Sequence, residues 1–320
     1  MSHALPQAFQ GGVDDSRFGG GSYGKIVLSL ACNNHCFFCY DQVERHRYKG
    51  MKEDEVRKNI DLAAANGVQV LTFIGGEVTL VPYFLRALEY AKGRFRDIHI
   101  NTNGRSFHDA AFARACVDAG LNQVDVSLHG STAAIHDAMV GAPGAFDELV
   151  QGLRNLVRLR DVEKKDVKLS ATSIVSTANH RDLVNVGGVL RGLGVTSYRV
   201  KYAFEPDHVD VAEARAWVPT FTESMPGVAA LLDAHGEALH VRTHDIPFCI
   251  LGRHLRASSG FHRITLDIYW PQETERAPQF SRRFARSKKC EGCFFEHACC
   301  QAVGRYVEAH GDGELHPYDA

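Results

Sequence analysis

The chain has 320 residues, of which 45% are hydrophobic and 23% charged, so it is long enough for one large core or two smaller ones, and disorder is not expected. Its formal net charge of −2 and its pI near 6.8 provide no bulk attraction to phosphate backbones or to anionic lipid. Nucleic acid is therefore not an expected partner.

After a glycine-rich stretch up to residue 24, which we predict to be a flexible leader, strand-like and helix-like patterns alternate. Six strands separated by helices favour parallel βα units, and short apolar strands suit a sheet covered by helices. The fold class is therefore α/β. The predicted strands lie at 25–31, 68–74, 98–102, 122–130, 167–175 and 196–203, and the predicted helices at 53–66, 82–92, 108–119, 145–159 and 180–193.

The rhythm of strands and helices changes after Glu205. A helical stretch near 211–235 is followed by irregular sequence that is rich in cysteine and aromatic residues. We therefore predict one domain over residues 25–205 and a second, small cysteine-rich domain over residues 206–320.

The compartment in which the chain resides decides whether its cysteines are expected to form disulfides or to remain as thiols. The N-terminal stretch lacks the basic and apolar regions of a signal peptide, and no run reaches the roughly 20 apolar residues that span a bilayer. We expect a cytoplasmic location without membrane contact, where clustered cysteines indicate metal binding or catalysis. Cys116 stands apart from the clusters in an apolar helical stretch and is predicted to be a core residue.

The first cysteine group has the spacing C-x3-C-x2-C and comprises Cys32, Cys36 and Cys39. It directly follows the first predicted strand, at the end of the sheet where parallel α/β folds build their sites. Because iron–sulfur clusters normally take four cysteines, three local thiolates imply an iron with an open coordination site. Zinc is the alternative, but it closes its tetrahedron with four ligands, and His35 lacks the usual finger spacing.

This spacing, with Phe38 before the third cysteine, resembles the signature of the radical S-adenosylmethionine (radical SAM) superfamily. The resemblance implies a 4Fe–4S cluster whose open iron chelates S-adenosylmethionine. It further implies that one electron from the cluster cleaves this ligand, and that the resulting 5′-deoxyadenosyl radical abstracts hydrogen. A reductant such as flavodoxin or ferredoxin is the implied electron donor.

Further motifs follow the next predicted strands and carry the same resemblance. Gly75, Gly76 and Glu77 match the family's GGE motif, which implies close backbone approach to the ligand and a carboxylate that accepts from the methionine ammonium. Asn103, in NTNG, matches a turn beside the ligand, and Ser127 matches a position that often reaches the ribose or carboxylate. Each is also a common turn signal, but their order at successive strand ends supports the family.

Two later strands offer weaker candidates. Ser170, Thr172 and Ser173 lie on the fifth predicted strand, and one of them is expected to face the barrel interior. Alternation places Arg199 and Lys201 on one side of the sixth strand, where they would meet a carboxylate in the barrel. Exposed basic residues or a structural ion pair remain the alternative interpretation.

The second cysteine group lies near the C-terminus. Cys249, Cys290, Cys293 and Cys299 would supply the four thiolates of a closed 4Fe–4S cluster, and Cys300 is an alternative fourth ligand. The spacing resembles the Twitch extension, a relative of the SPASM domain, although a structural zinc site fits it too.

The resemblance covers about residues 25–315 and implies a partial (βα)6 barrel that carries the cluster and S-adenosylmethionine at its mouth. We expect hydrogen abstraction from a small molecule or a peptide side chain, leading to oxidation, epimerisation or crosslinking. An RNA-modifying radical enzyme is disfavoured by the charge balance. A non-catalytic metal-binding module would not explain the GGE and NTNG motifs.

Overall fold

The computed structural model describes residues 23–39, 45, 50–202, 211–258, 266–269, 287–296, 299 and 304–319. These residues form one parallel sheet of eight strands in the order β7-β6-β5-β4-β3-β2-β1-β8. The strands are β1 (Tyr23–Ser29), β2 (Val70–Gly75), β3 (Asp97–Thr102), β4 (Gln123–Ser127), β5 (Lys168–Val175), β6 (Ser197–Tyr202), β7 (Arg242–His244) and β8 (Leu266–Tyr269).

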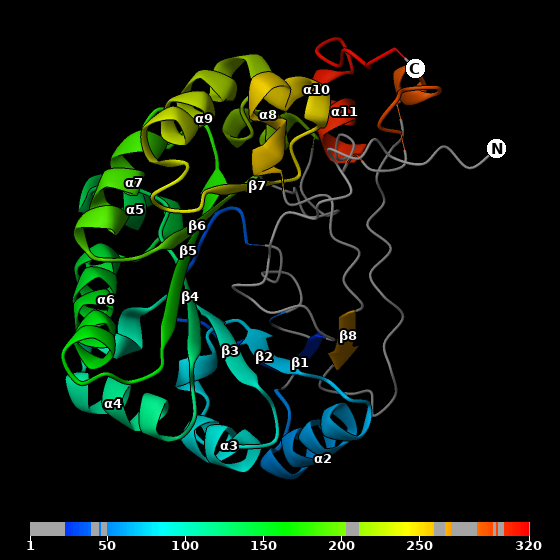
Figure 1. The fold of residues 1–320 in the computed structure, drawn as a ribbon. Coiled ribbons are helices and arrows are strands. Elements are labelled where there is room, and N and C mark those ends of the chain that lie inside the picture. Colours follow the sequence, from blue (N-terminus) through cyan, green and yellow to red (C-terminus); the bar gives the residue numbers. More distant parts are fainter. Residues whose placement is uncertain are drawn as a thin grey trace.

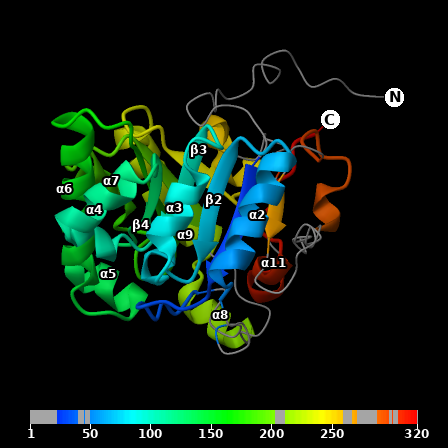
Figure 2. The same cartoon turned by 90° about the horizontal axis from the view of Figure 1, so that it is seen from below.

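Helices follow most of the strands and lie along the convex face of the curved sheet, as Figures 1 and 2 show from two directions. The α-helices are α2 (Glu53–Ala65), α3 (Phe84–Ala91), α4 (Ala110–Asp118), α5 (Ala133–Val140), α6 (Ala145–Asp161), α7 (Leu183–Gly192), α8 (Val211–Trp217), α9 (Phe221–His235), α10 (Phe248–Leu251) and α11 (Gly304–His310). The short 3-10 helices are η3 (Val78–Leu80), η4 (Arg105–His108), η5 (Gly252–Ala257) and η6 (Lys288–Cys290).

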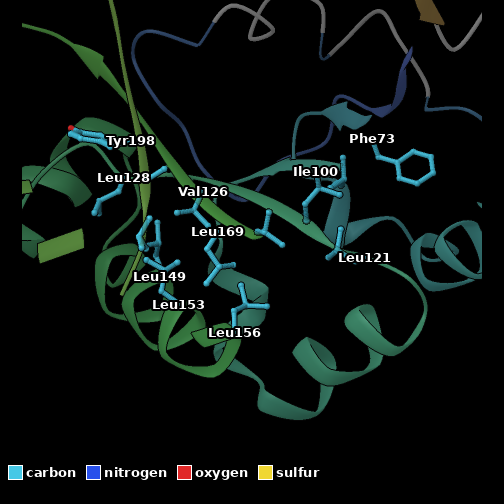
Figure 3. Close-up of a cluster of buried hydrophobic side chains, with 14 of the residues drawn as sticks. Phe73, Ile100, Leu121, Val126, Leu128, Leu149, Leu153, Leu156, Leu169 and Tyr198 are labelled. Carbon is cyan, nitrogen blue, oxygen red and sulfur yellow. The ribbon is translucent and has the colours of Figure 1, made fainter. Parts of the chain in front are cut away.

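The main core lies between the sheet and these helices. Leu149, Leu153 and Leu156 of α6 are fully buried and pack toward Val126 and Leu169 of the sheet (Figure 3). Burial of one such side chain contributes about 1.5–3 kcal/mol, so this interface is a major source of stability. The helix predicted at 145–159 is confirmed as α6, and the predicted burial of Cys116 is confirmed as well.

The parallel α/β architecture is as predicted, but the sheet has two more strands than the six expected. β7 pairs with β6, and β8 pairs with β1, so both strands extend the sheet at its edges. Each has only three or four residues, too few to show a pattern in the sequence. Both come from the segment beyond residue 205, which therefore contributes to the main sheet.

The structure also divides one predicted helix and contains one helix that was not predicted. The stretch near 211–235 is divided into α8 and α9, because Thr220 caps α9 and forms a reciprocal capping box with Glu223. Helix α5 was missed, since the apolar strand pattern obscured where β4 ends. Its own signals are local: the Thr132 side chain accepts a hydrogen bond from Ile135 N, and Gly141 ends the helix with a left-handed backbone.

Within the described ranges, no helix combines the length and the apolar character required to cross a bilayer.

Gly152 permits the close packing of α6 on η4 and yields a stability prediction. A Cβ at this position would lie 2.6 Å from the Gly104 oxygen and 3.0 Å from Phe107 Cβ, whereas Gly188 of α7 has open space around it. We expect Gly152→Ala to destabilise the fold by about 1–3 kcal/mol through overpacking. Gly188→Ala should instead stabilise it by about 0.5–1 kcal/mol through helix propensity. Thermal unfolding of both variants tests this contrast, and equal shifts would contradict it.

Candidate active site at the carboxyl end of the sheet

The loop that carries the first three cysteines begins where β1 ends, and the end of β2 fixes its starting point. Gly76 N donates to Ser29 O at 2.7 Å, and Glu77 N donates to Ala31 O at 2.7 Å. A Cβ on Gly76 would lie 2.3 Å from Ala31 O, and one on Gly75, which has a φ of 143°, would lie 2.0 Å from Ser29 O. Both glycines are thus required by the approach of the loop backbone itself.

The cluster loop, residues 30–39, directs its three thiols toward a common region. Cys32 Sγ accepts from Asn34 N at 3.4 Å, and Cys39 Sγ accepts from Arg45 Nη2 at 3.3 Å. Burial, together with the neighbouring thiols of Cys39 and Cys32, raises the pKa of Cys36 to about 12, and burial also raises the pKa of Cys32. Because their pKa values are raised, these thiols need a bound cation to become thiolates near neutral pH.

The donor set fits an iron–sulfur cluster. Three cysteine sulfurs of one loop influence one another electrostatically, as the pKa of Cys36 shows. Structural zinc takes four protein ligands, whereas three thiols are the number that leaves one iron of a 4Fe–4S cluster without a protein ligand. The C-x3-C-x2-C loop supplies that number.

Asn103 and Arg105, which follow β3, hold the cluster loop in place. Asn103 Nδ2 donates to Asn33 Oδ1 at 2.7 Å and lies 4.0 Å from Cys32 Sγ. Arg105 Nη1 donates to Asn33 O at 2.7 Å and to Asn34 Oδ1 at 2.9 Å. The sequence indicated Asn103 but not Arg105, whose only signal was its place directly after the NTNG turn.

The other face of Arg105 is tied to the helical layer. Its Nε donates to Glu148 of α6 at 2.5 Å, and only 16% of its side chain is exposed. On the opposite side of the loop, His35 N donates to Val140 O of α5 at 2.7 Å. The loop is therefore anchored to β2, to η4 and to α5, three elements that are distant in sequence.

Glu77 is fully buried and uses its carboxylate within the protein. Oε1 accepts from Thr79 N at 3.1 Å, from Thr79 Oγ1 at 2.7 Å and from Thr102 Oγ1 at 2.7 Å, and Oε2 accepts from Asn103 N at 2.7 Å. Burial raises the pKa of Glu77, and hydrogen bonds from Asn103, Thr79 and Thr102 oppose that rise. In this geometry Glu77 is a positioning residue that joins the ends of β2 and β3.

Ser127 ends β4 half-buried, level with Thr172 of β5. Of the three candidates on β5, Ser170 and Thr172 donate to Asp125 at 2.6 and 2.7 Å, so they face the concave side of the sheet. Ser173 points to the other side, where its hydroxyl bonds to Leu128 O and accepts from Tyr198 at 2.7 Å.

Arg199 also reaches Asp125, with which it forms an ion pair across β5. Burial opposes ionisation of Asp125, but Arg199, His99 and the two hydroxyls hold its pKa below the usual value. The structural ion pair left open by the sequence is thus present, and Asp125 is its partner. Sequence reasoning missed Asp125 because it lies inside an apolar strand.

The C-terminal cysteines gather around one apolar pocket. Cys249 lies on α10, Cys290 ends η6, and Cys293 and Cys299 follow, while Phe248, Phe295 and Leu315 supply apolar walls. Phe248 N donates to Cys299 Sγ at 3.4 Å. Burial raises the pKa of Cys249 and of Cys290, and neighbouring thiols add to both shifts. The alternative ligand, Cys300, lies outside the described residues.

The family model described as the Radical SAM superfamily matches residues 26–168, from β1 to the start of β5. The matched region contains Cys32, Cys36, Cys39 and every residue through Ser127 that the resemblance indicated. Residues 26–168 are therefore similar to the radical SAM domain of an enzyme superfamily. The family implies a 4Fe–4S cluster and S-adenosylmethionine.

Among curated proteins, a probable GTP 3′,8-cyclase of Saccharolobus islandicus (strain M.14.25 / Kamchatka #1) is 26% identical over 204 residues, which are 61% of this chain and 63% of that protein. The Fe-coproporphyrin III synthase of Methanosarcina barkeri (strain Fusaro / DSM 804) is 29% identical over 157 residues, 49% of this chain and 37% of that protein. The matches thus span less than two thirds of either relative.

Among solved structures, SuiB of Streptococcus suis bound to the precursor peptide SuiA aligns with a TM-score of 0.58 at 12% identity. The alignment covers 87% of this chain and 69% of that one. At this level of identity the similarity establishes a shared fold.

Arg105 provides a test of the loop anchors. We expect Arg105→Gln to release iron from the N-terminal site several-fold faster, because the loop loses charge-assisted hydrogen bonds to Asn33 and Asn34. Iron transfer to an external chelator is the measurement, in a background where Cys290 and Cys293 are Ala so that only the N-terminal site contributes. Arg154→Gln, an exposed charge loss on α6, is the matched control. Equal release rates for the two variants would show that Arg105 does not anchor the loop.

Proposed function

We propose that Cys32, Cys36 and Cys39 hold a 4Fe–4S cluster with one open iron, and that S-adenosylmethionine binds there. When bound, the cluster and S-adenosylmethionine together supply a carbon-centred radical that removes a hydrogen atom from a substrate. The observation that carries this proposal is the convergence of the cluster loop with the ends of β2 and β3. A flavodoxin or ferredoxin is the proposed electron donor.

Each neighbouring residue receives a defined task in this proposal. Gly76 keeps the loop backbone against β2, so the three thiols start from a fixed place. Asn103 and Arg105 orient the loop through Asn33. Ser127, half-buried at the end of β4, is proposed to contact the ribose or carboxylate of the ligand.

Glu77 is proposed to act on the ligand chiefly through Asn103. Its Oε2 receives one hydrogen bond, from Asn103 N, so it retains acceptor capacity toward the methionine ammonium. Because Glu77 is fully buried, such a contact requires the ligand ammonium to reach the carboxylate beyond the ends of β2 and β3.

The substrate class is proposed from the named relatives. The cyclase and the synthase carry small molecules in their names, GTP and coproporphyrin, whereas SuiB was solved with a precursor peptide. We favour a small molecule, because the two sequence relatives align at 26–29% identity and the peptide-binding structure at 12%. A peptide side chain is the second candidate. In its favour, the SuiB alignment covers 87% of this chain, a larger share than the alignments with the cyclase and the synthase.

The assignment of the N-terminal cluster is tested by changing Cys32, Cys36 and Cys39 together to Ala. Loss of all proposed protein ligands should abolish formation of 5′-deoxyadenosine from S-adenosylmethionine under dithionite. The measurement is product formation by anaerobically reconstituted protein, with Cys116→Ala as a control for removal of a thiol outside the site. Continued product formation in the triple variant would overturn the assignment.

We further propose that Cys249, Cys290, Cys293 and Cys299 bind a second 4Fe–4S cluster in a Twitch/SPASM-like arrangement. Four thiols lining one apolar pocket support a cluster shielded from water. A second cluster would offer the enzyme a site to accept an electron or to bind substrate.

Iron counting tests this second cluster. Anaerobically prepared wild-type protein should carry about eight irons per chain, and the variant with Cys290 and Cys293 changed to Ala about four. Cys300→Ser separates the candidate fourth ligands, because a thiol that binds no iron can be replaced with little loss. About four irons with one stoichiometric zinc in wild-type protein would rule the second cluster out.

A further inference from the structure

The concave face of the sheet is polar along β6. Tyr198, Val200 and Tyr202 alternate with half-buried residues and point toward the helices, where the Tyr202 hydroxyl meets Pro219 O and lies 3.0 Å from Ser224 Oγ. Because side chains alternate along a strand, Arg199 and Lys201 project from the opposite, concave face. The ion pair of Arg199 with Asp125 of β4 places its guanidinium there.

Strand β7 extends this polar surface. Arg199 pairs in register with Arg242, and Lys201 pairs with His244. Residues in register on parallel neighbours share a face, so Arg242 stands beside Arg199 on the concave side. Two guanidinium groups and one ammonium group are thus contributed by two adjacent strands at one edge of the sheet.

Titratable side chains of the concave face continue across the interior to β1. His99 of β3 lies within electrostatic reach of Lys25, Arg199 and Asp125, and burial lowers its pKa to about 4, so it adds no charge near neutral pH. On the same strand faces, Lys168 is neutralised by Asp97 at 3.0 Å. Among the described strand residues of the concave face, the other charged side chains are those of Asp125, Lys25, Arg199, Lys201 and Arg242.

The two arginines have hydrogen-bonding capacity that the described residues do not use. Arg199 Nε is buried and has no hydrogen-bond partner among them. Arg242 donates from Nη1 to Val241 O at 3.2 Å. A buried donor without a partner costs free energy, so a ligand acceptor at this position would remove a penalty as well as add an attraction.

We propose that the concave face of β6 and β7 binds an oxyanion group of the substrate, a carboxylate or a phosphate, with Arg242 and Arg199 as its donors. This inference rests on the proposed radical function, since it assigns the class of substrate that the same barrel takes. Arginine suits the role because its planar fork matches both groups. The residues proposed to contact S-adenosylmethionine lie on β1 to β4, so this edge of the sheet is left for substrate.

The test measures binding of inorganic phosphate and of glutarate to anaerobically reconstituted holoenzyme that is saturated with S-adenosylmethionine. Ligand-observed NMR follows the binding. We expect Arg242→Gln to raise the Kd of the preferred anion about tenfold or more, because a charge-assisted contact is lost. Arg242→Lys should retain most of the affinity, and Arg154→Gln on the outer face of α6 should match wild type. The preferred anion identifies the substrate group as phosphate or carboxylate.

A second variant guards against misfolding of the first. Arg199→Lys keeps a cation opposite Asp125 but removes the buried Nε donor, and it should weaken anion binding as well. Unchanged affinity in both variants would overturn the proposal. Binding that disappears when S-adenosylmethionine is present would also overturn it, because the cations would then serve the carboxylate of that ligand. Formation of 5′-deoxyadenosine by wild-type protein tests the radical function separately.

Discussion

The site depends on one close backbone contact, between the end of β2 and the loop that leaves β1. The hydrogen bonds from Gly76 and Glu77 to this loop, both 2.7 Å, leave no space for a Cβ at position 76. Because Cys32 is the next residue after Ala31, the contact determines where the first thiol begins. A three-cysteine site on a single loop has no distant ligand to hold it, so the scaffold must fix the loop itself.

Glu77 extends that constraint to β3 through a carboxylate that water does not reach. Burying a carboxylate is costly, and here four hydrogen bonds from Thr79, Thr102 and Asn103 offset the cost. The same Asn103 reaches the cluster loop through Asn33. Residues that the family resemblance associates with the ligand therefore also form a continuous path of contacts from the core to the cysteines.

The sequence was sufficient to predict periodic strands and short motifs, but not the roles of residues whose partners lie far away in the sequence. The parallel sheet and the strand-end motifs were predicted, because alternation and C-x3-C-x2-C spacing lie within short windows. β7 and β8 were missed because three or four residues carry no period. Arg105 and Asp125 were missed because their roles arise from partners across the fold: Arg105 with Asn33, 72 positions away, and Asp125 with Arg199, 74 positions away.

The polar residues of the concave face contribute less to stability than apolar residues would. Parallel sheets are ordinarily apolar on both faces, whereas this one carries hydroxyl, carboxylate and guanidinium groups on the concave side of β4, β5 and β6. A buried pair such as Asp125 with Arg199 gains little over well-packed apolar residues, because desolvation consumes most of the Coulomb attraction. Stability alone would thus favour aliphatic side chains at these positions. The hydroxyls and guanidinium groups that occupy them instead support the proposal above, because an oxyanion of the substrate would meet the donors of Arg199 and Arg242 on this face.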